Sequence, residues 1–318
     1  VWAVLAPGCT GLGALLVLGG VGGALGPLLI TAGSLGLLAI FGVVLSIQAV
    51  PFAMVMAGGA AAWLVGNGLW LNGWPVHALV PWWIGFLVLT SAGERLELSR
   101  MLFHAPWAKR LFLGCAALLG MGLLLSVRAP DPGFRVMGAG LGAMALWLGA
   151  FDMARRTVRA EGLTRFIAVC LHAGYGWLVV GGGLALAYGN TGAGLIYDAT
   201  LHAVFVGFVF SMIFGHAPVI FPSVLRMPIP YRPVFYLHVG VLHGSLLLRV
   251  GGDVWGVAAL RWWGGWGNAA AILLFLGLTL FSALVGEAPP PERTRPDGDE
   301  HPQPDRPDAE EIPDLRFD

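Results

Sequence analysis

The chain is a series of long apolar stretches separated by short polar loops. The first charged residue is Glu94, so 93 residues pass without a lysine, arginine, aspartate or glutamate. A membrane-spanning helix needs about 20 apolar residues, and this stretch alone has room for about four of them. Ten such helices are predicted, at about 3–24, 28–48, 51–72, 76–93, 108–127, 134–152, 164–188, 197–221, 231–250 and 267–286. We therefore expect an all-α, polytopic integral membrane helix bundle.

Composition supports the membrane assignment. The chain is 57% hydrophobic and 11% charged, with a mean hydropathy of +0.77, which lies outside the range of soluble globular proteins. Its formal net charge is zero, and no basic patch interleaved with aromatic residues indicates nucleic-acid binding. The three cysteines lack CxxC spacing and predict neither a disulfide framework nor a zinc site. The lipid bilayer is thus the first expected partner.

The loops and the C-terminal end differ in charge, and this difference predicts orientation. Arginines concentrate in 91–110, 152–165 and 222–233, whereas 72–75 and 189–198 have none. Arginine-rich loops face the cytoplasm, so ten spans place both termini there, in a bacterial-type inner membrane. Residues 128–135 carry two arginines against this pattern. We expect a transmembrane domain over 1–286 and a disordered, polar cytoplasmic tail over 287–318, which is rich in proline and charge.

Histidines are the ionisable residues that recur inside the predicted spans, and such residues are functional candidates. His202 and His216 lie fourteen positions apart on one predicted helix. In an α-helix that interval spans about 21 Å and returns to within about 40° of the same face. We therefore expect the two rings to serve separate centres at different depths. The other histidines in or beside spans are His77, His172, His238 and His243.

The predicted topology groups four of these histidines at one depth. His172, His216, His238 and His243 should lie in the cytoplasmic half of the bundle, whereas His77 is the expected partner of His202. Neutral imidazole binds haem iron and copper, and rings on facing helices can hold a haem within a bundle. Haem b, with copper as a further possibility, is therefore the expected cofactor.

Two further features would suit a haem, and both have simpler explanations. Glycines between 174 and 183 leave space where a flat ring could approach the backbone. Arg249, near a helix end, could pair with haem propionates. Glycine-rich stretches also allow tight helix packing, and an arginine at a helix end often extends to the membrane surface. Single histidines in a membrane often only hydrogen-bond neighbouring helices.

One region resembles the NnrS family of polytopic haem- and copper-containing membrane proteins, which are linked to nitric-oxide stress and denitrification. The resemblance covers about 50 residues, in the run HAVFVGFVFSMIFGHAP and the later segment FYLHVGVLHGSLLLRVGGD. NnrS proteins usually have about twelve spans and a histidine in the first, whereas this chain offers ten and no histidine before His77. A relation to subunit I of the haem–copper oxidases is more distant. The matching positions are His202, Ala203, Gly207, Met212, Gly215, His216 and 248–250.

Three functions follow from these features. The first is a b-type haem protein, with or without copper, in electron transfer or nitric-oxide-related chemistry. The second is a metal-ion transporter or metallochaperone with a histidine-lined path, and the third is a structural anchor for a redox partner or other membrane subunits. No aspartate or glutamate lies in the middle of a predicted span, which argues against proton pumping. No GxSxG, HExxH or phosphate-binding loop indicates a soluble-type hydrolase or nucleotide enzyme.

Overall fold

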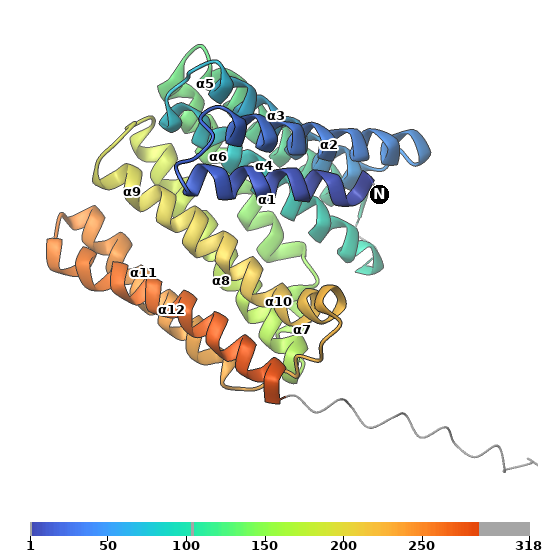
Figure 1. Cartoon of the computed structure of the whole chain (residues 1–318), viewed down its shortest axis with the longest axis vertical. Helices are drawn as coiled ribbons and strands as arrows, with labels where there is room; N and C mark the ends of the chain where they lie inside the picture. Colours follow the sequence, from blue (N-terminus) through green and yellow to red (C-terminus); the bar gives the residue numbers. More distant parts are fainter. Residues whose placement is uncertain (1, 103–104, 286–318) are drawn as a thin grey trace, which may run out of the picture. The chain divides into compact units, whose positions relative to one another are not determined.

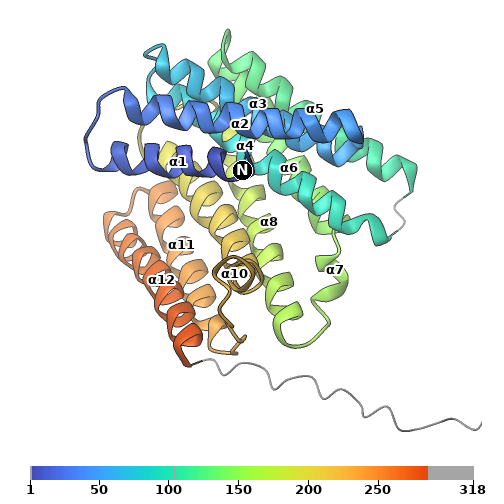
Figure 2. The same ribbon diagram turned by 45° about the vertical axis from the view of Figure 1, so that its right-hand side comes forward.

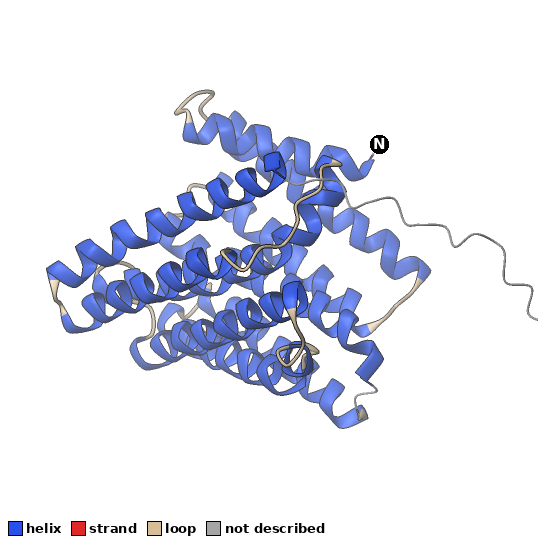
Figure 3. Ribbon diagram, turned by 90° about the horizontal axis from the view of Figure 1, so that it is seen from below, coloured by secondary structure: helices blue, strands red, loops and turns tan. Residues whose placement is uncertain are grey.

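The computed structural model describes residues 2–102 and 105–285, and this part of the chain contains helices and no strands (Figure 3). Each of the ten predicted segments coincides with a helix or with one continuous helical run. Their bounds are α1 Trp2–Leu18, α2 Leu25–Ile47, α3 Pro51–Leu71, α4 Val76–Leu98, α5 Pro106–Ser126, α6 Pro130–Phe151, α8 Gly162–Tyr188, the run of α9 Leu195–Leu201, η2 His202–Val209 and α10 Phe210–Leu225, then α11 Phe235–Trp255 and α12 Ala258–Val285. Short helices η1 (Ser99–Leu102) and α7 (Ala154–Thr157) lie between spans. The expected all-α class is confirmed.

Eight of the ten helices are long and apolar enough to cross a membrane. The other two are α1, which has 17 residues, and α11, which carries Arg249 and Asp253. Many large apolar side chains are exposed, including Leu15, Leu124 and Leu284. Exposed apolar surface on this scale is stable against lipid and not against water. The protein is therefore an integral membrane protein, and ten spans is an approximate count.

Local sequence explains where several helices begin. Pro51, Pro106 and Pro130 each occupy the first helical position, where the missing N–H costs no hydrogen bond. Gly256 follows α11 with a φ of 69°, a left-handed conformation that glycine adopts without strain. This residue turns the chain directly into α12, so α11 and α12 form a tight antiparallel pair.

Most helices pack as sequential antiparallel pairs, and α8 joins them. The pairs are α1–α2, α3–α4, α5–α6 and α11–α12, and α8 packs against α6 on one side and against η2 and α10 on another (Figures 1 and 2). On the α6–α8 contact the backbones touch at glycines. A Cβ on Gly138 would lie 2.6 Å from the carbonyl oxygen of Gly182. Small residues permit this approach, as is usual between membrane helices.

The run from Leu195 to Leu225 contains a π-helical segment over His202–Val209. Its hydrogen bonds reach five residues rather than four, so each residue turns the helix by less than in an α-helix. Gly207 in this segment packs on Trp177 of α8, and a Cβ there would lie 2.4 Å from the indole Cγ. The α-helical rotation assumed between His202 and His216 therefore does not hold. The prediction that both rings share one face is wrong.

The predicted tail, 287–318, lies outside the described residues.

Candidate metal site between α9, α11 and α12

Five ionisable side chains gather where η2 begins, and we call them the Asp198 cluster: Asp198, His202, Arg249, Asp253 and Arg261. Asp198 pairs with Arg249 and also with Arg261, whose Nη2 lies 3.2 Å from Asp198 Oδ2. Asp253 pairs with Arg261, and its Oδ2 lies 3.4 Å from Nε of Arg249. The cluster thus joins α9, α11 and α12 by a closed network of ion pairs.

Helical spacing accounts for most of this arrangement. Asp198 and His202 are four residues apart on one helix, and Arg249 and Asp253 are four residues apart on α11. Side chains at this spacing share a helix face. The turn at Gly256 then returns the chain so that Arg261, in the first turn of α12, faces the same two carboxylates. The contacts of Asp198 with Arg249 and both contacts of Arg261 join different helices and require the tertiary fold.

The cluster balances its own charge inside an apolar bundle. The side chain of Asp253 is 0% exposed, and that of Asp198 is 30% exposed. A buried carboxylate without a cation is costly, so the two guanidinium groups compensate for the two carboxylates. Oδ2 of Asp253 nevertheless has no hydrogen-bond partner, because the contact with Arg249 Nε lacks hydrogen-bond geometry. One buried ligand atom is therefore available.

His202 is held in the orientation that metal-binding histidines use. Its Nδ1 lies 2.9 Å from the carbonyl oxygen of Asp198, which can only accept, so Nδ1 carries the proton. In the neutral ring Nε2 then has a free lone pair. Ligand atoms of Asp198, His202 and Asp253 all lie within 4.8 Å of one another, in the one such group found over 2–102 and 105–285. Imidazole with carboxylates is a suitable ligand set for Zn²⁺, Cu²⁺ or Fe²⁺.

His216 and His172 also direct Nδ1 to the carbonyl oxygen four residues earlier, but their rings do not come together. His216 Nδ1 lies 2.6 Å from the carbonyl oxygen of Met212, and its Nε2 is buried 3.8 Å from a carboxylate oxygen of Glu94 on α4. His172 Nδ1 lies 2.9 Å from the carbonyl oxygen of Ala168. Cys170, two residues away, packs on α10 at Gly215. Two residues turn a helix by about 200°, so His172 points away from α10.

His238 and His243 have other surroundings. His238 is 1% exposed, both its ring nitrogens lack hydrogen-bond partners, and its ring centroid lies 4.6 Å from that of Phe214 and 5.4 Å from that of Phe275. Nδ1 of His243 accepts a 3.0 Å hydrogen bond from Trp177 Nε1. An accepting Nδ1 places the proton of the neutral ring on Nε2, which then cannot bind a metal.

The expected convergence of four histidines is therefore wrong as a single site. These side chains leave their helices in different directions and have different neighbours. His77 is exposed at the start of α4 and faces Gly192 of the α8–α9 loop. Arg249 pairs with two carboxylates of the protein, which haem propionates would have to replace.

The sequence reasoning missed Asp198, Asp253 and Arg261 as site residues. The i,i+4 pairs Asp198/His202 and Arg249/Asp253 were visible signals, because each places two ionisable groups on one helix face. No comparable signal marks Arg261, whose role depends on how α12 folds back.

A second buried polar group lies near the opposite end of α8. Asp152, at the C-terminal end of α6, accepts hydrogen bonds from Ser99 Oγ at 2.9 Å, from the N–H of Met153 at 2.7 Å and from the Tyr175 hydroxyl at 2.6 Å. Both carboxylate oxygens are satisfied. This network fixes the ends of α4 and α6 against the middle of α8.

One family model matches residues 1–284, and its description is a domain of unknown function (DUF8744). The chain belongs to this family. No curated protein and no solved structure matches the DUF8744 chain. The family description names no activity.

Proposed function

We propose that this DUF8744 protein binds a divalent transition-metal ion in the membrane, with Asp198, His202 and Asp253 as ligands. The observation that carries the proposal is that one ligand atom from each of these residues lies within 4.8 Å of the others, and that Oδ2 of Asp253 is buried without a hydrogen-bond partner. His202 donates through Nδ1, so Nε2 is the nitrogen with which its neutral ring would bind a metal. Copper is the ion of first interest, because it suits a ligand set of nitrogen and oxygen and binds most tightly in the divalent series.

The two arginines allow the site to be neutral without a metal ion and to accept one when it arrives. Without a cation, Arg249 and Arg261 neutralise the two carboxylates. A bound dication would take over this role, and the guanidinium groups would turn towards water, as long arginine side chains near a membrane surface can do. A site of this kind suits metal transport or metal delivery, in which the ion must also leave.

Metal titration of the purified protein in detergent tests the proposal. Copper or zinc uptake, measured by calorimetry and elemental analysis, should be one ion per chain and should be lost in His202→Ala and in Asp253→Asn. His77→Ala, which removes an exposed histidine outside the cluster, is the matched control and should bind normally.

Arg249→Met separates a metal site from a purely structural network. Removing a positive charge beside the carboxylates should strengthen metal binding by at least about tenfold. A structural network would instead give no stoichiometric uptake in the wild type and only a lower melting temperature in this variant. Uptake unaffected by His202→Ala would also contradict the proposal.

A haem b protein in electron transfer or nitric-oxide chemistry is the second candidate. The specific observation in its favour is that His172, His202 and His216 all direct Nδ1 to the carbonyl four residues earlier, which leaves Nε2 for iron. The resemblance to the NnrS family supports the same role. A dithionite-reduced minus oxidised spectrum of protein from haem-supplied cells should show a Soret band that His216→Ala removes, and a spectrum without haem bands would reject this candidate.

We also propose that both termini face the cytoplasm of a bacterial inner membrane, where a redox partner or further membrane subunits would meet the arginine-rich loops. A tag placed after residue 318 should be inaccessible to a membrane-impermeant reagent in intact spheroplasts. Labelling of the tag in spheroplasts that have not been lysed would show that the C-terminus faces the periplasm, and would contradict this orientation.

A further inference from the structure

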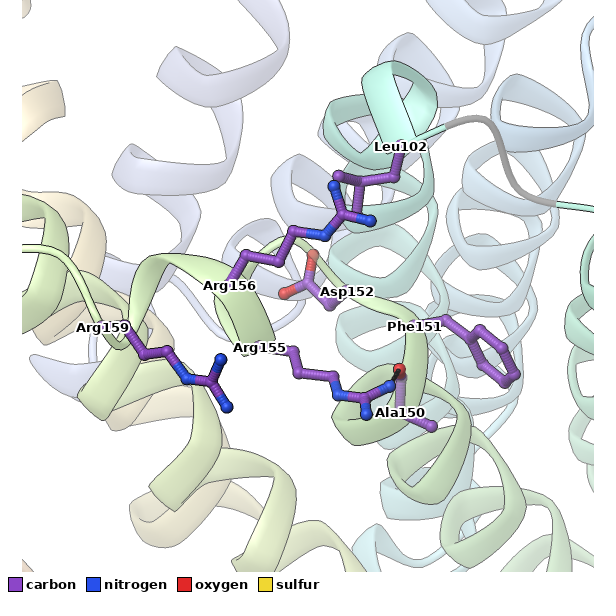
Figure 4. A pocket seen from close by; sticks show the side chains of 7 residues that line it. All are labelled: Leu102, Ala150, Phe151, Asp152, Arg155, Arg156 and Arg159. Carbon is purple, nitrogen blue, oxygen red and sulfur yellow. Dashed lines mark hydrogen bonds between the residues drawn. The ribbon is translucent and has the colours of Figure 1, made fainter.

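A cavity of about 470 Å³ lies where α6 passes into α7, apart from the Asp198 cluster. Three arginines from α7 and the turn after it surround it (Figure 4). Its wall is completed by η1 and by the end of α6. The lining residues are Leu102, Ala150, Phe151, Asp152, Arg155, Arg156 and Arg159.

The cavity is strongly positive. No acidic side chain within 2–102 and 105–285 forms an ion pair with Arg155, Arg156 or Arg159. Nη1 of Arg155 donates to the carbonyl oxygen of Ala150 at 3.1 Å, which holds this side chain along the wall. The only carboxylate in the lining, Asp152, already accepts from Ser99, Met153 and Tyr175. The lining thus carries three guanidinium groups and one carboxylate, both oxygens of which already accept hydrogen bonds.

The position of the cavity points to the membrane surface. It lies at the junction of two candidate spans, α6 and α8, which α7 connects. Phe151, in its wall, contacts Trp107 and Trp147 with ring centroids 5.5 Å and 5.4 Å apart. Tryptophans concentrate at the level of lipid headgroups. A lipid phosphate would therefore be at the right depth, beside aromatic surface for the start of its acyl chains.

We infer that this cavity binds the phosphate of an acidic phospholipid. Guanidinium groups bind phosphate oxygens through paired, charge-assisted hydrogen bonds, and basic pockets between membrane helices accept acidic headgroups. The adjacent Asp152 network makes the site rigid, because it fixes the end of α6 to α4 and α8. Lipid bound here would hold α7 in place between the two spans.

The test compares lipid retention by the full chain carrying paired substitutions. Native mass spectrometry of protein in detergent, titrated with phosphatidylglycerol or phosphatidylcholine, should show preferential retention of phosphatidylglycerol. Arg156→Gln/Arg159→Gln should weaken this retention by at least about tenfold. Lys109→Gln/Arg110→Gln removes two charges from exposed positions of α5 and should leave it unchanged.

Three further measurements distinguish a lipid phosphate from free phosphate and check that the variants are folded. Arg156→Lys/Arg159→Lys keeps the charge and should restore only part of the retention, because lysine cannot form the paired hydrogen bonds. Inorganic phosphate at millimolar concentration should not displace the lipid. Equal retention of both lipids, equal loss in the Lys109/Arg110 variant, or displacement by inorganic phosphate would overturn the inference. Melting temperatures measured without added lipid would show whether each variant is folded.

Discussion

Substitution of Gly138 by alanine tests whether the α6–α8 contact depends on backbone proximity. The added Cβ would lie 2.5 Å from the amide nitrogen of Leu186 and 2.6 Å from the carbonyl oxygen of Gly182. Both are backbone atoms, so no side-chain rotation relieves the overlap. Ordinary carbon contacts require about 3.5 Å or more, and the two helices must therefore separate by roughly 1 Å.

The cost follows from the contacts that such a separation loses. Overpacking a close contact destabilises proteins by about 1–3 kcal/mol, and the gain from replacing helical glycine by alanine is only about 0.5–1 kcal/mol. We therefore expect Gly138→Ala to lower the free energy of unfolding by about 1 kcal/mol, the difference between the middles of these two ranges. Gly142, one turn further along α6, has open space where its Cβ would lie. Gly142→Ala should be neutral or slightly stabilising.

Tryptophan fluorescence during unfolding in mixed detergent micelles would measure both variants. The prediction is the difference between them, since the two substitutions are chemically identical and lie on the same helix. Equal stability of Gly138→Ala and Gly142→Ala would refute the reasoning from backbone proximity.

Two further substitutions probe the described contacts. Gly207→Ala should place its Cβ against the Trp177 ring and displace the hydrogen bond from Trp177 Nε1 to His243. The expected loss of unfolding free energy is about 1–3 kcal/mol. Gly240→Ala, where the Cβ would meet open space, should leave the unfolding free energy unchanged. Tyr175→Phe removes a 2.6 Å hydrogen bond to the buried Asp152 and should lower the unfolding free energy by about 1–3 kcal/mol, as measured by thermal melting; an unchanged melting temperature would show that water replaces the hydroxyl.

The helices of this protein were predictable because each span carries its own signal. An apolar stretch of about 20 residues bounded by proline, glycine or charge identifies a membrane helix without any knowledge of its neighbours. The prolines at 51, 106 and 130 mark helix starts in the same local way. The ten predicted segments therefore correspond to the helices of the structure.

The direction of side chains was not predictable to the same degree. The angle between His202 and His216 depends on the π-helical segment that begins at His202, and apolar composition does not reveal a change from four-residue to five-residue hydrogen bonding. The contact between Arg261 and Asp253 depends on how α12 returns along α11. The positions of the helices along the chain could be predicted from sequence, whereas rotation about each helix axis required the packed structure.

The ion pairs around Asp198 also bear on how the last two helices assemble in the membrane. Arg249 and Asp253 offset each other on α11, so the α11–α12 hairpin enters the membrane with the one uncompensated positive charge of the Asp198 cluster, on Arg261. Asp198 supplies the matching negative charge and is synthesised earlier, on a helix already made when the hairpin emerges from the ribosome. Neither Asp198 alone nor the group of Arg249, Asp253 and Arg261 alone has a net charge of zero. The last hairpin is therefore most stable in lipid when it assembles on the preceding span of the same chain.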